Sequence, residues 1–227
     1  MKITYLGQAG LCFESGGKTI LVDPYLSNSV AQSQPQNVRR QPIDDRFLKI
    51  RPDIVVITHV HGDHYDKETL RHYLSDTSEI LVLASFGAWM DVRRFGGDKN
   101  RYVMFNNGTE WMEGEIRFRA VKAEHSDIYA IGVVISAEDK NYYVTGDTLY
   151  NKAVFESLPQ AEYEAVFLPV NGQGNNMNFT DAERFAARIQ AKRVVPLHIG
   201  MFDDMTADAW RCENKRIPQI YREIDIS

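Results

Sequence analysis

Short hydrophobic runs and stretches of alternating hydrophobic and polar residues recur along the chain, and both patterns are typical of β-strands. Hydrophobic residues at helical spacing predict helices over 66–75 and 86–95. The glycine pair Gly16-Gly17 indicates a turn between two early strands. In the first half of the chain, strands are predicted over residues 2–6, 10–15, 18–23, 54–57 and 80–84.

The second half of the chain mixes strands and helices in the same way. A short helix is predicted near 151–157 and a longer one over 180–190. Thr180 and Glu183 have the spacing of an N-terminal capping box, which makes Thr180 the expected N-cap. The two halves together predict an α/β fold. Strands are predicted over residues 101–105, 115–123, 129–136, 141–146, 164–169 and 193–197.

Residues 26–45 differ in composition from the rest of the chain. Serine, asparagine, glutamine and proline are crowded there, and these residues favour turns and loops. We therefore expect one long loop, and the sequence leaves open whether it acts as a lid over a site.

Composition limits the class of protein. The chain has 227 residues, which suits one domain over residues 1–227 that buries roughly 70% of its unfolded surface. A net charge of −5 without a long basic run argues against nucleic acid as a partner. No hydrophobic run is long enough to span a membrane, and the opening residues differ from a signal peptide. Cys12 and Cys212 are far apart in sequence and are expected to be reduced thiols, so a cytoplasmic protein is expected.

A cluster of histidines follows the hydrophobic run 54–57. It places His59, His61, Asp63 and His64 within six positions. Imidazole nitrogens and carboxylate oxygens are ligands that zinc and similar divalent metals accept. His59 and His61 project to the same side of an extended chain and can share one ion. Asp63 and His64, beyond the intervening glycine, can reach a neighbouring ion.

Other candidate ligands also stand at the ends of predicted strands. His125, Asp147 and His198 each follow such a segment, and five of the six histidines of the chain belong to this set. In open α/β sheets, ligands gather beyond the carboxyl ends of strands. We therefore expect these side chains to form one metal site.

The His-X-His-X-Asp-His motif, followed in order by His125, Asp147 and His198, resembles the metallo-β-lactamase superfamily of metal-dependent hydrolases. The resemblance covers nearly the whole chain, from Leu21-Val22-Asp23-Pro24 to His198. It implies an αβ/βα sandwich, in which two packed mixed β-sheets are flanked by helices.

Within that superfamily, three segments are most similar to the L-ascorbate-6-phosphate lactonase-like branch. They are Thr19–Asn28, Tyr143–Tyr150 and Leu168–Asn178. This similarity implies a small, polar, phosphorylated substrate and makes a homo-oligomer unsurprising.

The superfamily resemblance also implies a role for each candidate ligand. Two divalent ions are expected, with zinc favoured by the five histidines and manganese or iron as alternatives. A hydroxide bridging the two metals would be the nucleophile, since a metal lowers the pKa of bound water to roughly 7. His59, His61 and His125 would hold one ion, Asp63, His64 and His198 the other, and Asp147 would bridge them.

Two further residues are expected to assist the metal site. Asp23 ends a predicted strand and is expected to orient a ligand histidine through its second ring nitrogen, although an Asp-Pro pair is also a common turn. In lactonases of the superfamily, a tyrosine at the offset of Tyr150 from Asp147 points toward the substrate carbonyl. The resemblance therefore implies that Tyr150 donates a hydrogen bond to the oxyanion, with an exposed or core tyrosine as the alternative.

The glycine- and asparagine-rich segment before the last helix is the second unusual feature. It contains Asn171, Asn175 and Asn176 beside free backbone N–H groups at a helix N-terminus, which favours a polar or anionic substrate. The alternative is a turn-rich connection. Arg39 and Arg40 in the long polar loop are candidates to pair with a substrate phosphate.

One position departs from the family pattern. Many related hydrolases carry a histidine in the glycine-flanked segment after the first strand, where this chain has Gln8. Glutamine can hydrogen bond but cannot carry positive charge. This change puts in doubt the substrate of the characterised lactonases, while the metal ligands are unaffected.

Three functions remain open from the sequence. We expect a hydrolase that opens a lactone or related ester of a small polar metabolite. A phosphodiesterase acting on a small or cyclic phosphodiester is the alternative, because two metals can also direct water onto phosphorus. A metal-binding protein without catalytic activity is the third, and the complete ligand set argues against it.

Overall fold

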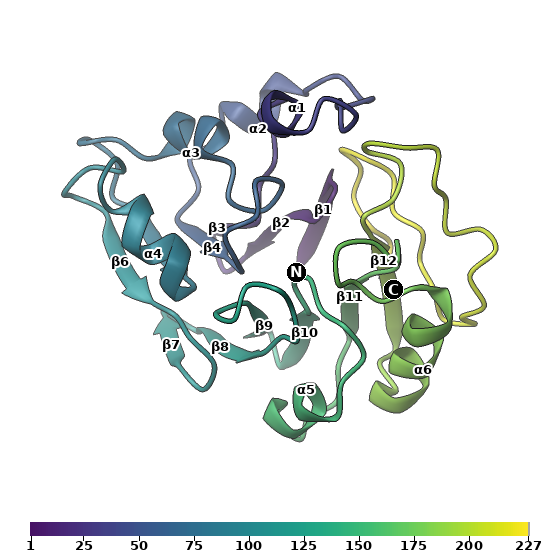
Figure 1. The fold of residues 1–227 in the computed structure, drawn as a ribbon. Coiled ribbons are helices and arrows are strands. Elements are labelled where there is room, and N and C mark those ends of the chain that lie inside the picture. The colour runs from purple at the N-terminus through teal and green to yellow at the C-terminus, as the bar shows by residue number, and fades with distance from the viewer. Residues whose placement is uncertain (227) are drawn as a thin grey trace.

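The computed structural model describes residues 1–226, and its strands form two six-stranded sheets (Figure 1). In spatial order, the first sheet consists of β1 (Lys2–Gly7), β2 (Gly10–Ser15), β3 (Lys18–Val22), β4 (Ile54–Ile57), β5 (Leu81–Ala84) and β6 (Arg101–Met104). The second consists of β12 (Arg193–Leu197), β11 (Ala165–Pro169), β10 (Lys140–Val144), β9 (Ile131–Ala137), β8 (Ile116–Lys122) and β7 (Glu110–Glu113). Both sheets are mixed: β1–β3 and β7–β10 pair antiparallel, while β3–β6 and β10–β12 pair parallel.

Helices flank both sheets on their outer faces (Figure 1). Helices α3 and α4 lie against the first sheet, and α5 and α6 lie against the second. Within residues 1–226, no helix combines the length and the hydrophobicity needed to cross a bilayer. The helices are α1 (Val30–Ser33), α2 (Asp45–Leu48), α3 (Lys67–Tyr73), α4 (Phe86–Val92), α5 (Lys152–Ser157) and α6 (Phe179–Ile189).

Strand β4 shows how the hydrophobic pattern produces these layers. All four of its residues are buried, as expected for a parallel strand covered on both faces. Val56 contributes to the core between the two sheets, where Phe118 and Val133 of the second sheet also lie. Val55 points to the opposite side and packs with Leu70 in the core beneath α3 and α4. The predicted αβ/βα sandwich is therefore confirmed.

The start of α6 differs from the prediction. The N-cap is Asn178, whose side chain accepts a hydrogen bond from the backbone N–H of Asp181 at 2.9 Å. Thr180 already lies in the first turn, so the predicted capping box is wrong. Glu183 instead accepts a hydrogen bond from the backbone N–H of Arg211, a contact from a distant segment that local spacing does not reveal.

Two regions carry more structure than their sequence suggests. The polar segment 26–45 contains the single-turn helix α1, and α2 begins at its end. Strand β7 was not predicted; it is four residues long and alternates exposed and half-buried positions. It pairs only with β8 at the edge of its sheet.

Candidate metal centre

The site lies where strands from both sheets end. Asp23 follows β3, and His59 follows β4. From the second sheet, His125 follows β8, Asp147 follows β10 and His198 follows β12. These strands run in the same direction within each sheet, so that their carboxyl ends deliver the side chains to one edge. The structure brings together all seven residues that the sequence predicts as ligands.

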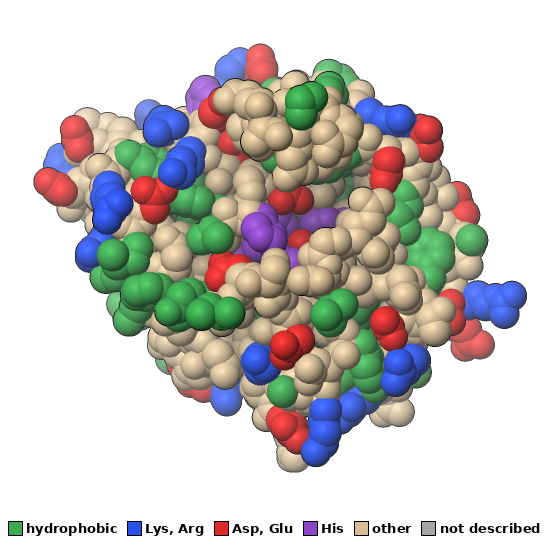
Figure 2. All heavy atoms as spheres, viewed as in Figure 1, with side chains coloured by type: hydrophobic (Ala, Val, Ile, Leu, Met, Phe, Trp, Pro, Cys, Tyr) green, Lys and Arg blue, Asp and Glu red, His purple; other side chains and the backbone are tan. Residues whose placement is uncertain are grey.

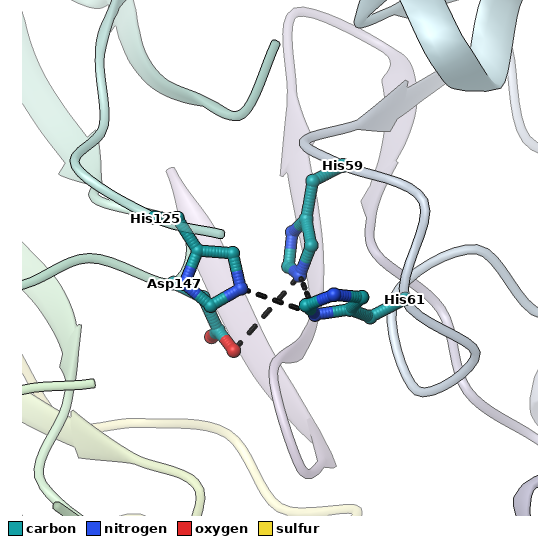
Figure 3. A group of neighbouring side chains, drawn as sticks. All are labelled: His59, His61, His125 and Asp147. Atoms are coloured by element: carbon teal, nitrogen blue, oxygen red, sulfur yellow. Dashed lines mark hydrogen bonds and ion pairs between the residues drawn. The ribbon is translucent and has the colours of Figure 1, made fainter. Parts of the chain in front are cut away.

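The first group of potential ligands consists of His59, His61, His125 and Asp147, which point toward one another from three segments of the chain (Figure 3). His61 Nδ1 lies 3.2 Å from His59 Nε2 and 3.1 Å from His125 Nε2. The nearest oxygen of Asp147, Oδ2, is 3.9 Å from His59 Nε2.

The second group consists of Asp63, His64 and His198. The Nε2 atoms of the two histidines are 3.1 Å apart, and Asp63 Oδ2 lies 3.9 Å from His64 Nε2. Both histidines are buried, whereas Asp63 is half-buried at the cavity wall.

The carboxylate of Asp147 stands between the two groups. Its Oδ2 faces His59, while its Oδ1 lies 3.2 Å from His64 Nε2 and 2.8 Å from His198 Nε2. Despite these short distances, Oδ1 is buried and has no aligned hydrogen-bond donor. A buried carboxylate oxygen without a donor is costly unless a cation compensates it. One oxygen facing each group is the arrangement that a bridging ligand requires.

Separations between the ring nitrogens test whether the groups fit a metal. A tetrahedral zinc ion with Zn–N bonds of about 2.0–2.1 Å places its ligand nitrogens roughly 3.3–3.4 Å apart. The observed nitrogen–nitrogen separations of 3.1–3.2 Å are close to that edge length. Three imidazole nitrogens and a carboxylate also make a suitable zinc donor set. The residues of the first group therefore fit a divalent metal.

The second ring nitrogens of three histidines have hydrogen-bond acceptors. His64 Nδ1 is 2.7 Å from Asp23 Oδ2, and His125 Nδ1 is 3.3 Å from the backbone carbonyl of Asn175. His59 Nδ1 is 3.0 Å from the hydroxyl oxygen of Thr58. When Nδ1 carries the proton, Nε2 is left as a lone-pair donor toward the centre. Asp23 therefore has the orienting contact predicted for it.

Thr58 links these contacts. Its hydroxyl and its backbone N–H both donate to Asp23, so that Asp23 supports His64 directly and His59 through Thr58. Little in the local sequence distinguishes Thr58 from other strand residues, because threonine is common in strands. Its position between a ligand and an acidic residue became evident only in the fold.

Electrostatics separate the histidines into two types. Burial lowers the pKa of His59 well below the ordinary value, and the charge of His64 adds to this effect. Burial also lowers the pKa of His125. For His64, burial acts in the same direction, but the carboxylates of Asp147, Asp63 and Asp23 outweigh it and raise its pKa well above the ordinary value. His59 and His125 are thus neutral at pH 7, whereas His64 retains a proton in the metal-free protein.

Asp147 is ionised in this setting. Burial alone would raise its pKa, but the nearby charges of His198 and His64 hold that pKa well below the ordinary range. A buried carboxylate that stays ionised is available to bind cations.

Three residues at the same edge have left-handed backbone conformations. Gln8, Asp23 and His198 have positive φ angles of 54°, 45° and 60°, which cost non-glycine residues of order 1–3 kcal/mol. Each follows a strand end directly, and the positive φ turns its side chain into the site. The tertiary structure maintains these conformations because each side chain is held there by hydrogen bonds.

Gln8 contacts two of the potential ligands. Its Nε2 lies 2.8 Å from Asp63 Oδ2 and 2.9 Å from His198 Nδ1, and its backbone carbonyl accepts from the His198 N–H at 2.8 Å. The residue that departs from the family histidine therefore holds two members of the second group in place.

A cavity of about 730 Å³ opens above the two groups, within the range of roughly 300–1,000 Å³ typical of small-molecule sites. Figure 2 shows the histidines exposed at the bottom of this hollow. The cavity is lined by His61, Asp63, Asp147 and His198 together with segments 30–37, 171–176 and 201–203. The sequence indicated the second of these segments and left open whether the first covers a site, but it did not indicate the third.

The predicted substrate-binding residues separate into two sets. Asn171, Asn175 and Asn176 line the cavity, and Asn176 Nδ2 donates to Asp147 Oδ2 at 3.0 Å. Arg39 and Arg40 do not line it. Arg39 binds the backbone carbonyls of Tyr25 and Gln41, and Arg40 pairs with Asp204.

Tyr150 also lies apart from the cavity lining. Its ring packs on Phe155 with centroids 5.5 Å apart, and the Arg184 guanidinium lies 4.3 Å from the ring centroid. These contacts place Tyr150 against the core beneath α5 and α6. The geometry does not support an oxyanion-binding role for this tyrosine.

Comparisons with known proteins agree with this site. A family model described as "Beta-lactamase superfamily domain" matches residues 18–199. A UPF0173 metal-dependent hydrolase of Flavobacterium johnsoniae is 30% identical over 214 residues, covering 89% of this chain and 86% of the relative. One from Geobacillus thermodenitrificans is 29% identical over 227 residues, covering 92% and 89%. The chain belongs to the metallo-β-lactamase superfamily, among the UPF0173 metal-dependent hydrolases.

Solved structures share the fold. An isothiocyanate hydrolase from Delia radicum gut bacteria matches with a TM-score of 0.77 and 21% identity over 99% of both chains. A metallo hydrolase from the archaeon Ignicoccus hospitalis matches with a TM-score of 0.76 and 20% identity, covering 98% of this chain and 96% of the other. At these identities the match concerns the architecture alone.

Proposed function

We propose that this protein is a dinuclear metal-dependent hydrolase that opens the lactone or a related ester of a small polar metabolite. The observation that carries the proposal is the position of Asp147, with one carboxylate oxygen toward each of two ligand groups at the bottom of an open cavity. Membership of a family of metal-dependent hydrolases supports it.

The fit of the donor set supports the following ligands. His59, His61 and His125 would hold one ion, Asp63, His64 and His198 the other, and Asp147 would contact both. When bound, the ions supply a water of lowered pKa and a Lewis acid for the substrate carbonyl. Zinc suits this histidine-rich set best, while iron also accepts imidazole nitrogen and manganese accepts the carboxylate oxygens of the set.

The protein's own side chains perform the remaining tasks. Asp23 and Thr58 orient His64 and His59 through their Nδ1 atoms. Asn176 fixes one oxygen of Asp147 and also lines the cavity, so it couples the position of the substrate to that of the metal ligands. Asp63 is half-buried and contacts the cavity, where its carboxylate can accept a proton from the attacking water.

A phosphodiesterase is the second candidate, since the same ions can direct water onto phosphorus. It would need cationic side chains around the phosphate. Arg39 and Arg40 were the expected cations, and both are engaged outside the cavity. This observation ranks ester hydrolysis first.

Acid production distinguishes the two reactions. Metal-reconstituted protein is given a sugar lactone and, in parallel, a cyclic phosphodiester, and proton release is followed by pH-stat. Acid from the lactone alone, abolished by a chelator, is the expected result. Acid from the diester alone would replace the proposal with the second candidate.

A further inference from the structure

Carboxamide side chains dominate the cavity above the ligand groups. Of the twenty residues that line it, eight are asparagine or glutamine and none is lysine or arginine; all twenty belong to the described part of the chain. Figure 2 shows the hollow bordered mainly by tan atoms, which are backbone and side chains that are neither hydrophobic nor charged, with the blue lysine and arginine side chains away from its mouth. The eight carboxamides are Gln8, Gln34, Gln36, Asn37, Asn171, Gln173, Asn175 and Asn176.

The charged residues of the lining are acidic or histidine. The carboxylates are those of Asp63, Asp147 and Asp203. Metal ions would balance the first two, but a phosphate group held away from the metals would meet no cationic side chain. An unpaired phosphate dianion loses hydration on entering such a cavity without an ionic partner in return.

The N-terminus of α6 does not replace the missing cation. Sequence reasoning expected its free N–H groups to favour an anion. The side chain of Asn178 accepts from the Asp181 N–H, and the Asp181 carboxylate occupies the first turn. An acidic residue in that turn already offsets the positive end of the helix dipole, which disfavours a further anion at this helix end.

The exposed carboxamides of the wall can exchange hydrogen bonds with a neutral polar substrate. Gln173 and Asn175 are exposed and line the cavity. Their side-chain oxygens can accept from a substrate hydroxyl or amide N–H, whereas a phosphate dianion offers only acceptors. The carboxamide nitrogens of the wall can in turn donate to substrate oxygens.

We infer that the cavity binds an uncharged substrate rich in hydroxyl or amide groups, such as an unphosphorylated sugar lactone, and discriminates against its phosphorylated form. The type of reaction in this inference rests on the proposed hydrolytic function. The choice of an uncharged substrate rests on the cavity lining alone. It separates this chain from the phosphorylated substrate that its resemblance to the lactonase-like branch implies.

A matched pair of substrates tests the inference. Zinc-loaded full-length protein is given D-glucono-1,5-lactone and the same lactone carrying a 6-phosphate, and kcat/KM is measured for both. The neutral lactone is expected to be preferred by at least about 10-fold, since a site without a partner for a charged group rejects it strongly. Equal values or a preference for the phosphorylated lactone would overturn the inference.

A binding measurement separates this inference from the proposed reaction. The two corresponding lactams, whose ring amide resists opening, are titrated into the zinc-loaded protein in a calorimeter. Tighter binding of the neutral lactam supports the inference even if neither lactone is opened, an outcome that would reject only the lactonase proposal. Tighter binding of the phosphorylated lactam, or no binding of either, would overturn the inference.

A positive charge introduced into the cavity wall, compared with the same charge introduced outside the cavity, provides a matched pair of variants. Gln173 is exposed and lines the cavity, whereas Gln219 is exposed and lies outside it. Gln173→Lys is expected to improve kcat/KM for the phosphorylated lactone several-fold, and Gln219→Lys to leave it unchanged. An equal response of the two variants would show that the substrate does not occupy this cavity.

Discussion

Asp23 Oδ2 lies 2.7 Å from His64 Nδ1, and both side chains are almost fully buried. The same carboxylate accepts two hydrogen bonds from Thr58. Such a buried carboxylate–histidine pair fixes the ring orientation and the proton position of a metal ligand. Asp23 therefore links the end of β3 to the potential metal ligands that follow β4. Its removal should weaken metal binding more than it destabilises the fold.

Asp23→Asn is the sharpest test of this role. Asparagine is close to isosteric but lacks the negative charge, so zinc affinity of the second group is expected to fall about 10–100-fold. Calorimetric zinc titration measures the change, and circular dichroism checks that the fold is retained. Asp139→Asn, at an exposed position, is the control. Unchanged affinity in Asp23→Asn would remove Asp23 from the metal centre.

Asp147→Ala should have the largest effect on metal content. Its two oxygens face both ligand groups, so both ions lose a ligand at once. We expect the second ion to be lost and kcat to fall by more than about 100-fold. Mutation of a residue that only hydrogen bonds to a metal ligand already lowers metal affinity or activity by about 10–100-fold. Metal analysis by mass spectrometry and lactone kinetics check this. Retention of two ions with full activity would contradict the bridging role.

Gln8→Asn tests whether Gln8 positions the second group. Asparagine tolerates the positive φ at this position, but its shorter side chain cannot reach Asp63 and His198 together. We expect about 10-fold weaker binding of the second zinc ion and unchanged binding of the first. A stepwise zinc titration distinguishes the two events. Equal weakening of both steps would indicate a general structural effect rather than a positioning role.

The two ligand groups should respond differently to pH. The raised pKa of His64 means that a proton must leave before its Nε2 can bind zinc. Affinity of the second group is therefore expected to increase with pH above 6.5, with release of a proton. The lowered pKa values of His59 and His125 leave both neutral there, so the first group should change little.

Calorimetry in buffers of different ionisation enthalpy counts the protons released in each step. His72 is exposed and lies outside both ligand groups, so His72→Gln should give the wild-type profile. The same pH dependence for both ions would contradict the assignment of the retained proton to His64.

The ligands could be predicted from sequence because their signal is local. Four of them fall within six positions after a fully hydrophobic strand, and the others stand at the ends of further strands. Parallel strands deliver their carboxyl ends to one edge within each sheet, and the two-sheet sandwich that the superfamily resemblance implies brings His125 and His198 of the second sheet to His59 of the first.

The cavity walls could not be predicted in the same way. Residues 34–37 reach the site because the polar segment that carries them is tied to distant partners, such as the Arg40 N–H to the Met201 carbonyl. The same contacts direct Arg39 and Arg40 away from the cavity. Tyr150 lies apart from the cavity because packing against Phe155 and Arg184 sets its orientation, and neither contact has a signature in sequence spacing.

The most direct test of the account is the number and position of bound metals. Crystals of zinc-loaded protein, measured at the zinc absorption edge, locate each ion by anomalous scattering. The account predicts two ions about 3.5–4 Å apart, one beside His59, His61 and His125, the other beside Asp63, His64 and His198, with Asp147 touching both. A single ion, or two ions that Asp147 does not join, would contradict it.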